Sequence, residues 1–433
     1  MADINAQENG ENAPLLSTTS QPVPAPRGAW VRIVVPVGLT VVFAIAAILA
    51  FALPRAQLPI LDRVGVVDTH IDLPLLLRMF YKNDINQFDM RATMPGHVDI
   101  ARLRTGHVGG VFWSVFVPCS AELGKDEGPD FMIPTYRVRD TLEQIDITKL
   151  MIDEYPDVFE YATTAKGMRA AMSSGKVASL IGVEGGHQLE NSLGVLRMYY
   201  ELGARYMTLT HTCNNAFADS AGIGATPTPL HGGLSPFGVE LIYEMNRLGM
   251  MVDISHVSDD TAIQAFNVSR APLLFSHSSS RAVHNVRRNV PDSILELIGE
   301  GEGKKDAVVM VIFAPDFVAD KDKADVKAVA DHVVHIAHIA GPRHVGIGSD
   351  YDGITSVPQG LEDVSKYPAL FEELRSRGWD DTMLAGLAQY NLLRVFEGVE
   401  KTAMEMRWEG VKPAMALYDK RADLLDEIDS FFE

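Results

Sequence analysis

Hydrophobic residues along the chain gather in short runs that alternate with longer stretches of mixed character. From residue 60 onward these runs have the length of buried strands. The predicted strands are Val64–Asp68, Val108–Val117, Ala178–Val183, Tyr206–Thr210, Met250–Ile254, Pro272–Phe275, Ala307–Phe313 and His344–Gly348. Helices are predicted between several of them, at Thr141–Tyr155, Leu193–Leu202, Pro236–Leu248 and Val326–Ile339.

This alternation predicts an α/β fold with parallel strands. Eight strands that alternate with helices are typical of a (β/α)8 TIM-type barrel with insertions. An open, doubly wound sheet has the same periodicity and is the alternative that the pattern leaves open. No internal repeat or low-complexity linker divides the region, which favours one domain over residues 60–410 and a C-terminal extension over 411–433.

The amino terminus has a different pattern. Residues 1–32 are polar and rich in Pro, Ser, Ala and Asn, which is typical of a disordered tail. Ile33–Leu53 is a run of 21 uncharged residues. As a helix it would span about 31 Å, the thickness of a hydrocarbon core. We expect a retained transmembrane signal anchor over 33–53, and a cleaved signal peptide is the alternative because Ala50-Phe51-Ala52 resembles a cleavage site.

The side of the membrane is indicated by one short motif. Two arginines lie close to each end of the apolar run, so charge does not set its orientation. The sequon Asn267-Val268-Ser269 is an acceptor for N-glycosylation, which occurs outside the cytoplasm. We therefore expect a single-pass membrane protein whose large domain lies on the extracellular or lumenal side.

Composition excludes several classes of protein. Hydrophobic residues make up 47% of the chain and charged residues 22%, which is ordinary for a globular protein. The net charge of -19, from 38 basic and 57 acidic residues, argues against a nucleic-acid partner. Cys119 and Cys213 are too few for a disulfide scaffold or a cysteine-rich zinc site, although they could form one bridge.

Histidines and carboxylates follow six of the predicted strands, at the strands' carboxyl ends. They are His70, Asp72, Glu184, His211, His256, His277 and Asp350. In a parallel barrel these ends converge on one mouth, where barrel active sites lie. Nitrogen and carboxylate ligands without a thiolate pair suit zinc or a similar divalent ion.

This set of ligands is larger than one catalytic zinc requires. Because a glutamate can donate one oxygen to each of two metals, the sequence predicts a dinuclear centre. Two ions about 3.5–4 Å apart lower the pKa of a shared water to near 7, which supplies a metal-bridging hydroxide. A serine nucleophile is disfavoured, because the chain contains no Gly-x-Ser-x-Gly motif.

The same residues lie in motifs that resemble those of the membrane dipeptidase (renal dipeptidase) family of zinc peptidases. The resemblance spans roughly residues 62–400. The motifs that carry it include Asp68-Thr69-His70-Ile71-Asp72, Gly182-Val183-Glu184-Gly185-Gly186-His187, Thr210-His211-Thr212-Cys213-Asn214, Ser276-His277-Ser278, Arg287-Arg288-Asn289-Val290-Pro291 and Gly348-Ser349-Asp350-Tyr351-Asp352-Gly353.

The resemblance implies a (β/α)8 barrel with two zinc ions and a role for each site residue. His70 and Asp72 would hold one zinc, His256 and His277 the other, and Glu184 would bridge them. By the same resemblance, His211 would stabilise the tetrahedral intermediate, Arg288 would bind the substrate carboxylate, and Asp350 would transfer the proton. Cys119 and Cys213 fall where the family has a disulfide close to the active site.

The resemblance therefore implies zinc-dependent hydrolysis of dipeptides, and it suggests a homodimer. The first alternative is another metal-dependent amidohydrolase, which would act on N-acyl amino acids or cyclic amides with the same metals. The second alternative is a membrane-tethered binding protein that keeps the barrel without catalysis. The complete set of ligands argues against this second alternative.

Overall fold

The computed structural model describes residues 59–119, 136–224, 227–320 and 322–420. The predicted tail (residues 1–32) and the predicted transmembrane segment (33–53) lie outside these ranges. None of the helices within them has both the length and the apolar character needed to cross a membrane. The residues from Leu58 onward form one compact unit by themselves.

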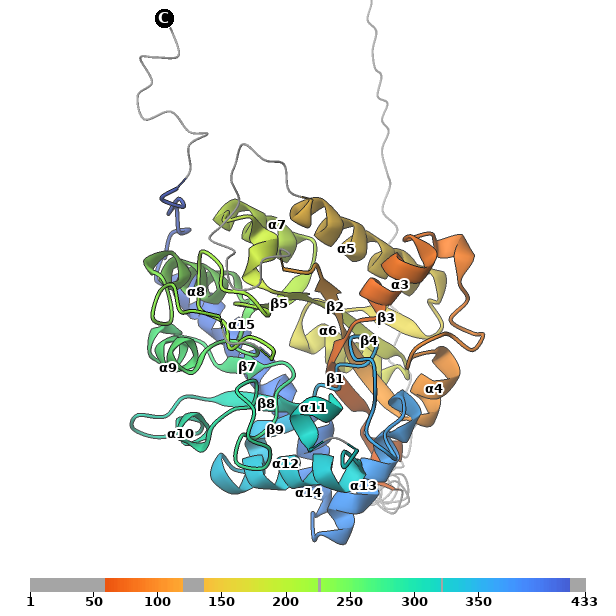
Figure 1. The fold of residues 1–433 in the computed structure, drawn as a ribbon. Coiled ribbons are helices and arrows are strands. Elements are labelled where there is room, and N and C mark those ends of the chain that lie inside the picture. The colour runs from red at the N-terminus through yellow and green to blue at the C-terminus, as the bar shows by residue number, and fades with distance from the viewer. Residues whose placement is uncertain (1–58, 120–135, 225–226, 321, 421–433) are drawn as a thin grey trace, which may run out of the picture. The chain divides into compact units, whose positions relative to one another are not determined.

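Eight parallel strands close into a ring at the centre of this unit (Figure 1). They are β1 (Val66–Ile71), β2 (Val108–Phe116), β4 (Val177–Glu184), β5 (Ala204–Thr208), β6 (Met251–Asp253), β7 (Leu273–Phe275), β8 (Ala307–Val311) and β9 (Val345–Ile347). Each strand pairs with the next, and β9 returns to β1 through Asp68 and Ile347. The (β/α)8 barrel is thus confirmed, and the open sheet is wrong.

All eight predicted strands are present, with ends that differ by up to three residues from the predicted bounds. One further strand, β3 (Phe159–Tyr161), lies outside the ring and pairs with Val177–Ser179 of β4. Its three residues are too few for the hydrophobic pattern to distinguish them from a loop.

The helices of the described residues lie around the strands (Figure 1). They are α2 (Ile60–Arg63), α3 (Leu73–Tyr81), α4 (Ile100–Thr105), α5 (Arg137–Glu154), α6 (Ala165–Ser173), α7 (Leu193–Glu201), α8 (Pro236–Leu248), α9 (Asp259–Val268), α10 (Asp292–Leu295), α11 (Pro315–Val318), α12 (Val326–Ile339), α13 (Tyr367–Ser376), α14 (Asp381–Ala385) and α15 (Asn391–Trp408). α8 and α12 have the predicted bounds because Ser235 and Asp325 cap their first turns, by accepting hydrogen bonds from the backbone of Gly238 and Ala328.

One hydrophobic core fills the inside of the barrel, and another lies between the strands and the surrounding helices. Alternate strand residues point outward against the helices, and the remaining ones fill the inside of the ring together with residues of α6 and α15. α15 lies at the amino-terminal ends of the strands, where Gly398 packs against Pro272 just before β7. The carboxyl ends of the strands are therefore left for the polar residues that follow them.

Candidate metal centre and active site

The strand-end residues converge at the mouth of the barrel. His70 is the next-to-last residue of β1 and Asp72 follows the end of that strand, whereas Glu184 is the last residue of β4. The others lie in the loops after β5, β6, β7 and β9, and they are His211, His256, His277 and Asp350. In the ring, β9 and β8 lie between β1 and β7, and β5 and β6 lie between β4 and β7, so the closed barrel is what brings these side chains together.

One group of ligands centres on His70. Its Nε2 atom lies 3.4 Å from Asp72 Oδ2 and 3.6 Å from Glu184 Oε1. All three side chains are buried, and together they could hold one metal ion.

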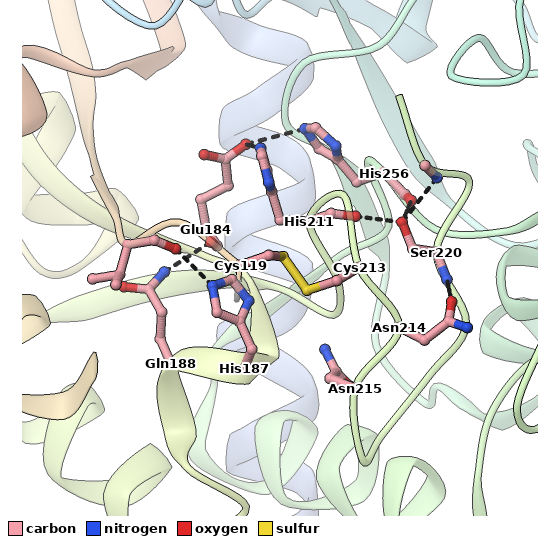
Figure 2. Close-up of a disulfide and its surroundings, with 12 residues drawn as sticks. Cys119, Glu184, His187, Gln188, His211, Cys213, Asn214, Asn215, Ser220 and His256 are labelled. Carbon is pink, nitrogen blue, oxygen red and sulfur yellow. Dashed lines mark hydrogen bonds and ion pairs between the residues drawn. A yellow bond between two sulfur atoms is a disulfide. The ribbon is translucent and has the colours of Figure 1, made fainter. Parts of the chain in front are cut away.

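A second group centres on the same glutamate. Glu184 Oε1 lies 3.1 Å from His256 Nε2 and 3.2 Å from His277 Nε2, and these two nitrogens are 2.8 Å apart. Figure 2 shows the Glu184 carboxylate directed at His256 and His211. Because Glu184 belongs to both groups, it lies where a ligand that bridges two ions must lie.

Unpaired polar atoms show that these groups fit metal ions. His70 Nε2 and Asp72 Oδ1 are buried and have no hydrogen-bond partner in the described part of the chain. A buried polar atom left without a partner costs about 1–3 kcal/mol. Divalent cations would satisfy these atoms, and imidazole and carboxylate are ligands that zinc accepts.

The electrostatics of the groups also favour cations. Burial, and then the charges of Arg288 and His211, hold the pKa of His256 well below its usual value, so its nitrogen lone pair is free. Burial lowers the pKa of His70 as well, but the carboxylates of Asp72 and Glu184 outweigh it and raise that pKa well above its usual value. The carboxylates thus attract positive charge to the point where a metal would lie.

His211 is held by its surroundings on two sides. Its Nε2 atom lies 3.7 Å from Glu184 Oε1, and the Phe116 ring packs against it with centroids 4.4 Å apart. Cys213, two residues further on, forms a disulfide with Cys119, and this confirms the pairing that the family resemblance implied. Figure 2 shows the disulfide beside His211.

His187, in the same loop motif as Glu184, does not join the metal ligands. Its Nε2 atom lies 2.6 Å from the carbonyl oxygen of Val117. Burial lowers its pKa to about 3, so the ring is neutral and donates this hydrogen bond. The nearby cysteine sulfurs are bonded to each other and are not available to a metal.

Arg288 and Arg287, which the sequence could not separate by physical reasoning, have different environments. Arg287 is exposed, whereas Arg288 is buried and donates from Nη1 to Ser278 Oγ (2.9 Å) and from Nη2 to the His277 carbonyl (2.6 Å). Burial lowers the pKa of Arg288 to about 10, which keeps it charged near neutral pH. Its guanidinium lies 5.7 Å from the centroid of the Phe317 ring.

A cavity of about 280 Å³ opens at the ligands. Its walls include Asp72, Glu184, His211, His256, Asp350, Phe116, Ile223, Phe317 and Ile354. Arg288 is not among the described residues that line it, but Phe317 both lines the cavity and lies close to the Arg288 guanidinium. A larger cavity of about 570 Å³, beside Phe237 and Tyr418, contains none of the predicted site residues.

Asp350 faces the first group of ligands. Its Oδ1 atom lies 3.8 Å from His70 Nε2, and its backbone N–H donates to the His70 carbonyl. Burial and the negative charge of Asp72 raise the pKa of Asp350 well above its usual value. A carboxyl group with a raised pKa can both accept and return a proton near neutral pH.

Residues that contact the ligands from behind were missed by the sequence reasoning. Tyr206 Oη lies 2.9 Å from His70 Nδ1, and Ser276 Oγ lies 2.8 Å from His277 Nδ1. Ser276 in turn donates to Asp253 Oδ2 (2.6 Å). Asp253 lies within the predicted strand Met250–Ile254 and is the last residue of β6, but a position at a strand end does not by itself assign this role.

Asn267 of the predicted sequon is exposed in the last turn of α9. An accessible side chain is what an acceptor of a glycan requires, and the glycosylation itself stays a prediction.

A family model described as membrane dipeptidase (peptidase family M19) matches residues 55–410. Among solved structures, a metallopeptidase from Rhodobacter sphaeroides, liganded with a phosphinate mimic of the dipeptide L-Ala-D-Ala, is 27% identical with a TM-score of 0.68. The alignment covers 78% of this chain and 99% of that one.

Two further structures have the same TM-score of 0.68. The dipeptidase AC, a metallopeptidase of family M19, is 26% identical, and the alignment covers 78% of this chain and 98% of that one. The probable dipeptidase PvdM from Pseudomonas aeruginosa is 22% identical, with 79% of this chain and 97% of that one covered, which shows a shared fold.

Proposed function

Because this chain belongs to the membrane dipeptidase family, peptidase family M19, we propose that it hydrolyses the single peptide bond of dipeptides with two zinc ions. The observation that carries the proposal is the position of Glu184 Oε1. It lies within 3.6 Å of His70 Nε2 and within 3.2 Å of His277 Nε2, so that one carboxylate serves two groups of ligands. His70 and Asp72 would hold one ion, and His256 and His277 the other.

Bound zinc would supply a water with a pKa near 7 and would polarise the scissile carbonyl. Asp350 would take a proton from the attacking water and deliver it to the leaving amine, and its 3.8 Å distance from His70 Nε2 and its raised pKa support this role. His211 lines the same cavity, with its Nε2 atom 3.7 Å from Glu184 Oε1, and would stabilise the negative charge on the carbonyl oxygen.

Arg288 would bind the substrate's carboxylate. After its two hydrogen bonds to Ser278 and His277, one hydrogen remains on each terminal nitrogen and one on Nε, which has no partner among the described residues. Rotation of the Phe317 ring would expose the Arg288 guanidinium to the cavity. A carboxylate bound here and an amine near Asp350 would limit the substrate to two residues.

We also propose that residues 33–53 anchor the protein in a membrane with the barrel on the extracellular or lumenal side. The Cys119–Cys213 disulfide supports this side, because disulfides form and persist in oxidising compartments. Protease protection in sealed microsomes, whose cytoplasmic face points outward, tests this orientation. A lumenal barrel should resist added protease until detergent opens the vesicles, whereas a cytoplasmic barrel would be digested at once. The homodimer stays a prediction.

The test of the activity combines zinc analysis with hydrolysis assays on the full chain in detergent. We expect two zinc ions per chain, hydrolysis of dipeptides in preference to tripeptides and N-acyl amino acids, and loss of activity with a chelator that added zinc reverses. Hydrolysis of N-acyl amino acids in preference to dipeptides would favour the amidohydrolase alternative. Far fewer than two zinc ions per chain, without any hydrolysis, would contradict the proposal.

A further inference from the structure

A chain of buried hydrogen bonds runs behind His277, on the side away from the ligand cluster. His277 Nδ1 lies 2.8 Å from Ser276 Oγ, and Ser276 Oγ donates to Asp253 Oδ2 at 2.6 Å. All three side chains are almost completely buried, so water does not compete for these bonds. The direction of each hydrogen bond therefore depends on the protein groups alone.

The carboxylate at the end of the chain sets that direction. Asp253 Oδ1 accepts from the backbone N–H groups of Ser255 (3.0 Å) and Ser276 (2.8 Å), while Oδ2 accepts from the hydroxyls of Thr208 (2.5 Å) and Ser276. Four donors are directed at Asp253, and a carboxylate can only accept hydrogen bonds. The hydroxyl hydrogen of Ser276 must therefore point to Asp253.

This direction determines which nitrogen of His277 carries the proton. A serine hydroxyl has one hydrogen, so Ser276 can only accept from His277 once that hydrogen is donated to Asp253. The neutral ring then carries its proton on Nδ1, and the lone pair on Nε2 faces Glu184 Oε1 (3.2 Å) and His256 Nε2 (2.8 Å). A lone pair at that point is what a metal ligand requires.

We infer that Asp253 acts through Ser276 as a positioning residue, which fixes the Nδ1–H tautomer of His277 and so prepares Nε2 to bind a metal ion. The inference rests on the zinc centre proposed above, but not on its substrate. At His70 the corresponding partner is the phenol of Tyr206, which can either donate or accept. The direction of the hydrogen bond to Nδ1 is therefore fixed at His277 but not at His70.

The tautomer can be measured directly in the wild-type protein. In the zinc-free protein near neutral pH, the ring ¹⁵N chemical shifts of His277 should show a protonated Nδ1 and an unprotonated Nε2. A proton on Nε2 would overturn the inference. No variant is needed for this measurement, so it does not depend on whether a substitution at Asp253 folds.

Substitutions then test whether Asp253 is the cause. In Asp253→Asn the amide keeps Oδ1 for the two backbone donors but places N–H groups where Oδ2 was. Ser276 would accept from this amide and donate to His277 Nδ1, which moves the ring proton to Nε2. We expect zinc affinity, measured by competition with a chelator, to fall about 10–100-fold. Thr208→Val is the matched control, because it removes the other hydroxyl donor to Asp253 Oδ2 and leaves the direction of the Ser276 hydrogen bonds unchanged. Its zinc affinity should stay within twofold of the wild type.

A double variant separates this role from a structural one. Ser276→Ala removes the hydroxyl that accepts from His277 Nδ1 but puts no donor in its place, so the ring proton is not forced to Nε2. The zinc affinity of Ser276→Ala should therefore fall less than that of Asp253→Asn. The double variant Asp253→Asn/Ser276→Ala should then bind zinc as Ser276→Ala does. If the two losses instead add, or if Asp253→Asn binds zinc as tightly as the wild type, the inference is wrong. Normal zinc binding without dipeptide hydrolysis would contradict the proposed function and leave this inference standing.

Discussion

At the scale of single residues, two members of the site have a strained backbone. His256 and Asp350 have φ values of 64° and 68°, in the left-handed region that residues other than glycine rarely adopt. Such strain costs about 1–3 kcal/mol and persists only where surrounding contacts fix the chain. Asp350 has such a contact in the hydrogen bond from its N–H to the His70 carbonyl (3.0 Å). The backbone thus holds these side chains at the mouth whatever their charge.

Replacing Asp350 by asparagine should separate catalysis from metal binding. Asparagine tolerates positive φ as aspartate does and has the same shape, so the fold and the zinc content should be kept. Because the amide cannot accept a proton, we expect kcat to fall about 10²–10⁴-fold. Steady-state kinetics beside zinc analysis checks this, and wild-type turnover in Asp350→Asn would show that another group moves the proton.

Replacing Arg288 by methionine should remove recognition of the substrate's carboxylate. Loss of a charge-assisted pair costs about 1.5–3 kcal/mol, which corresponds to a decrease in kcat/KM of roughly 10–100-fold. The exposed neighbour provides the control, and Arg287→Met should behave as the wild type.

The specific readout for Arg288 is a comparison of a dipeptide with its C-terminal amide. The wild type should prefer the free carboxylate, and Arg288→Met should lose that preference. If the variant is slower on both substrates but keeps the preference, Arg288 acts through its bonds to Ser278 and His277 instead.

At the scale of elements, the ends of neighbouring strands are joined where the ligands lie. The backbone of Asp72 donates to the carbonyl of Tyr351, so that the loops after β1 and β9 run together. Gly353, in the second loop, lies so close that an added Cβ would come within 2.3 Å of Asp72 Oδ2 and 2.8 Å of Asp350 Oδ1. The glycine is needed here for close approach of the chain to the ligands.

We therefore expect Gly353→Ala to weaken zinc binding more than it weakens the fold. The new methyl group would displace the carboxylate of Asp72, and displacement of one ligand should lower zinc affinity by at least tenfold. Thr355→Ala, two residues away in the same loop, changes no ligand and is the control. Chelator competition and the melting temperature of the zinc-free protein check the two effects, and unchanged affinity in Gly353→Ala would contradict the steric argument.

At the scale of the whole molecule, a buried histidine links the helical layer to the loops around the site. His332 of α12 accepts a hydrogen bond at Nδ1 from the backbone of Ser280 (3.0 Å) and donates from Nε2 to the carbonyl of Val318 (2.8 Å). Both bonds require a neutral ring. Burial lowers the pKa of His332 to about 4, below its ordinary value of 6.5.

This histidine should make the stability of the protein depend on pH. Between pH 6.5 and 4 the unfolded chain binds a proton at His332 and the folded chain does not, so stability falls as the pH falls through this window. The loss should reach about 3 kcal/mol at pH 4. We expect His332→Asn to show a correspondingly shallower decline in the free energy of unfolding, measured with denaturant at several pH values. The exposed His338→Asn is the control, and equal slopes in all three proteins would contradict the assignment.

The sequence by itself determined the strands, most of the helix bounds that were predicted, and the polar residues at the strand ends. These features are local, because hydrophobic periodicity and capping residues act over a few positions of the chain. The family motifs added the pairing of Cys119 with Cys213, which the structure contains.

Only the tertiary structure decided that the sheet closes, that Arg288 is buried while Arg287 is exposed, and that His187 turns to Val117 rather than to the ligands. It also revealed the chain of hydrogen bonds from Asp253 to His277. The physical reason is that burial, pKa and the direction of a hydrogen bond depend on neighbours from distant strands, which a local pattern does not encode.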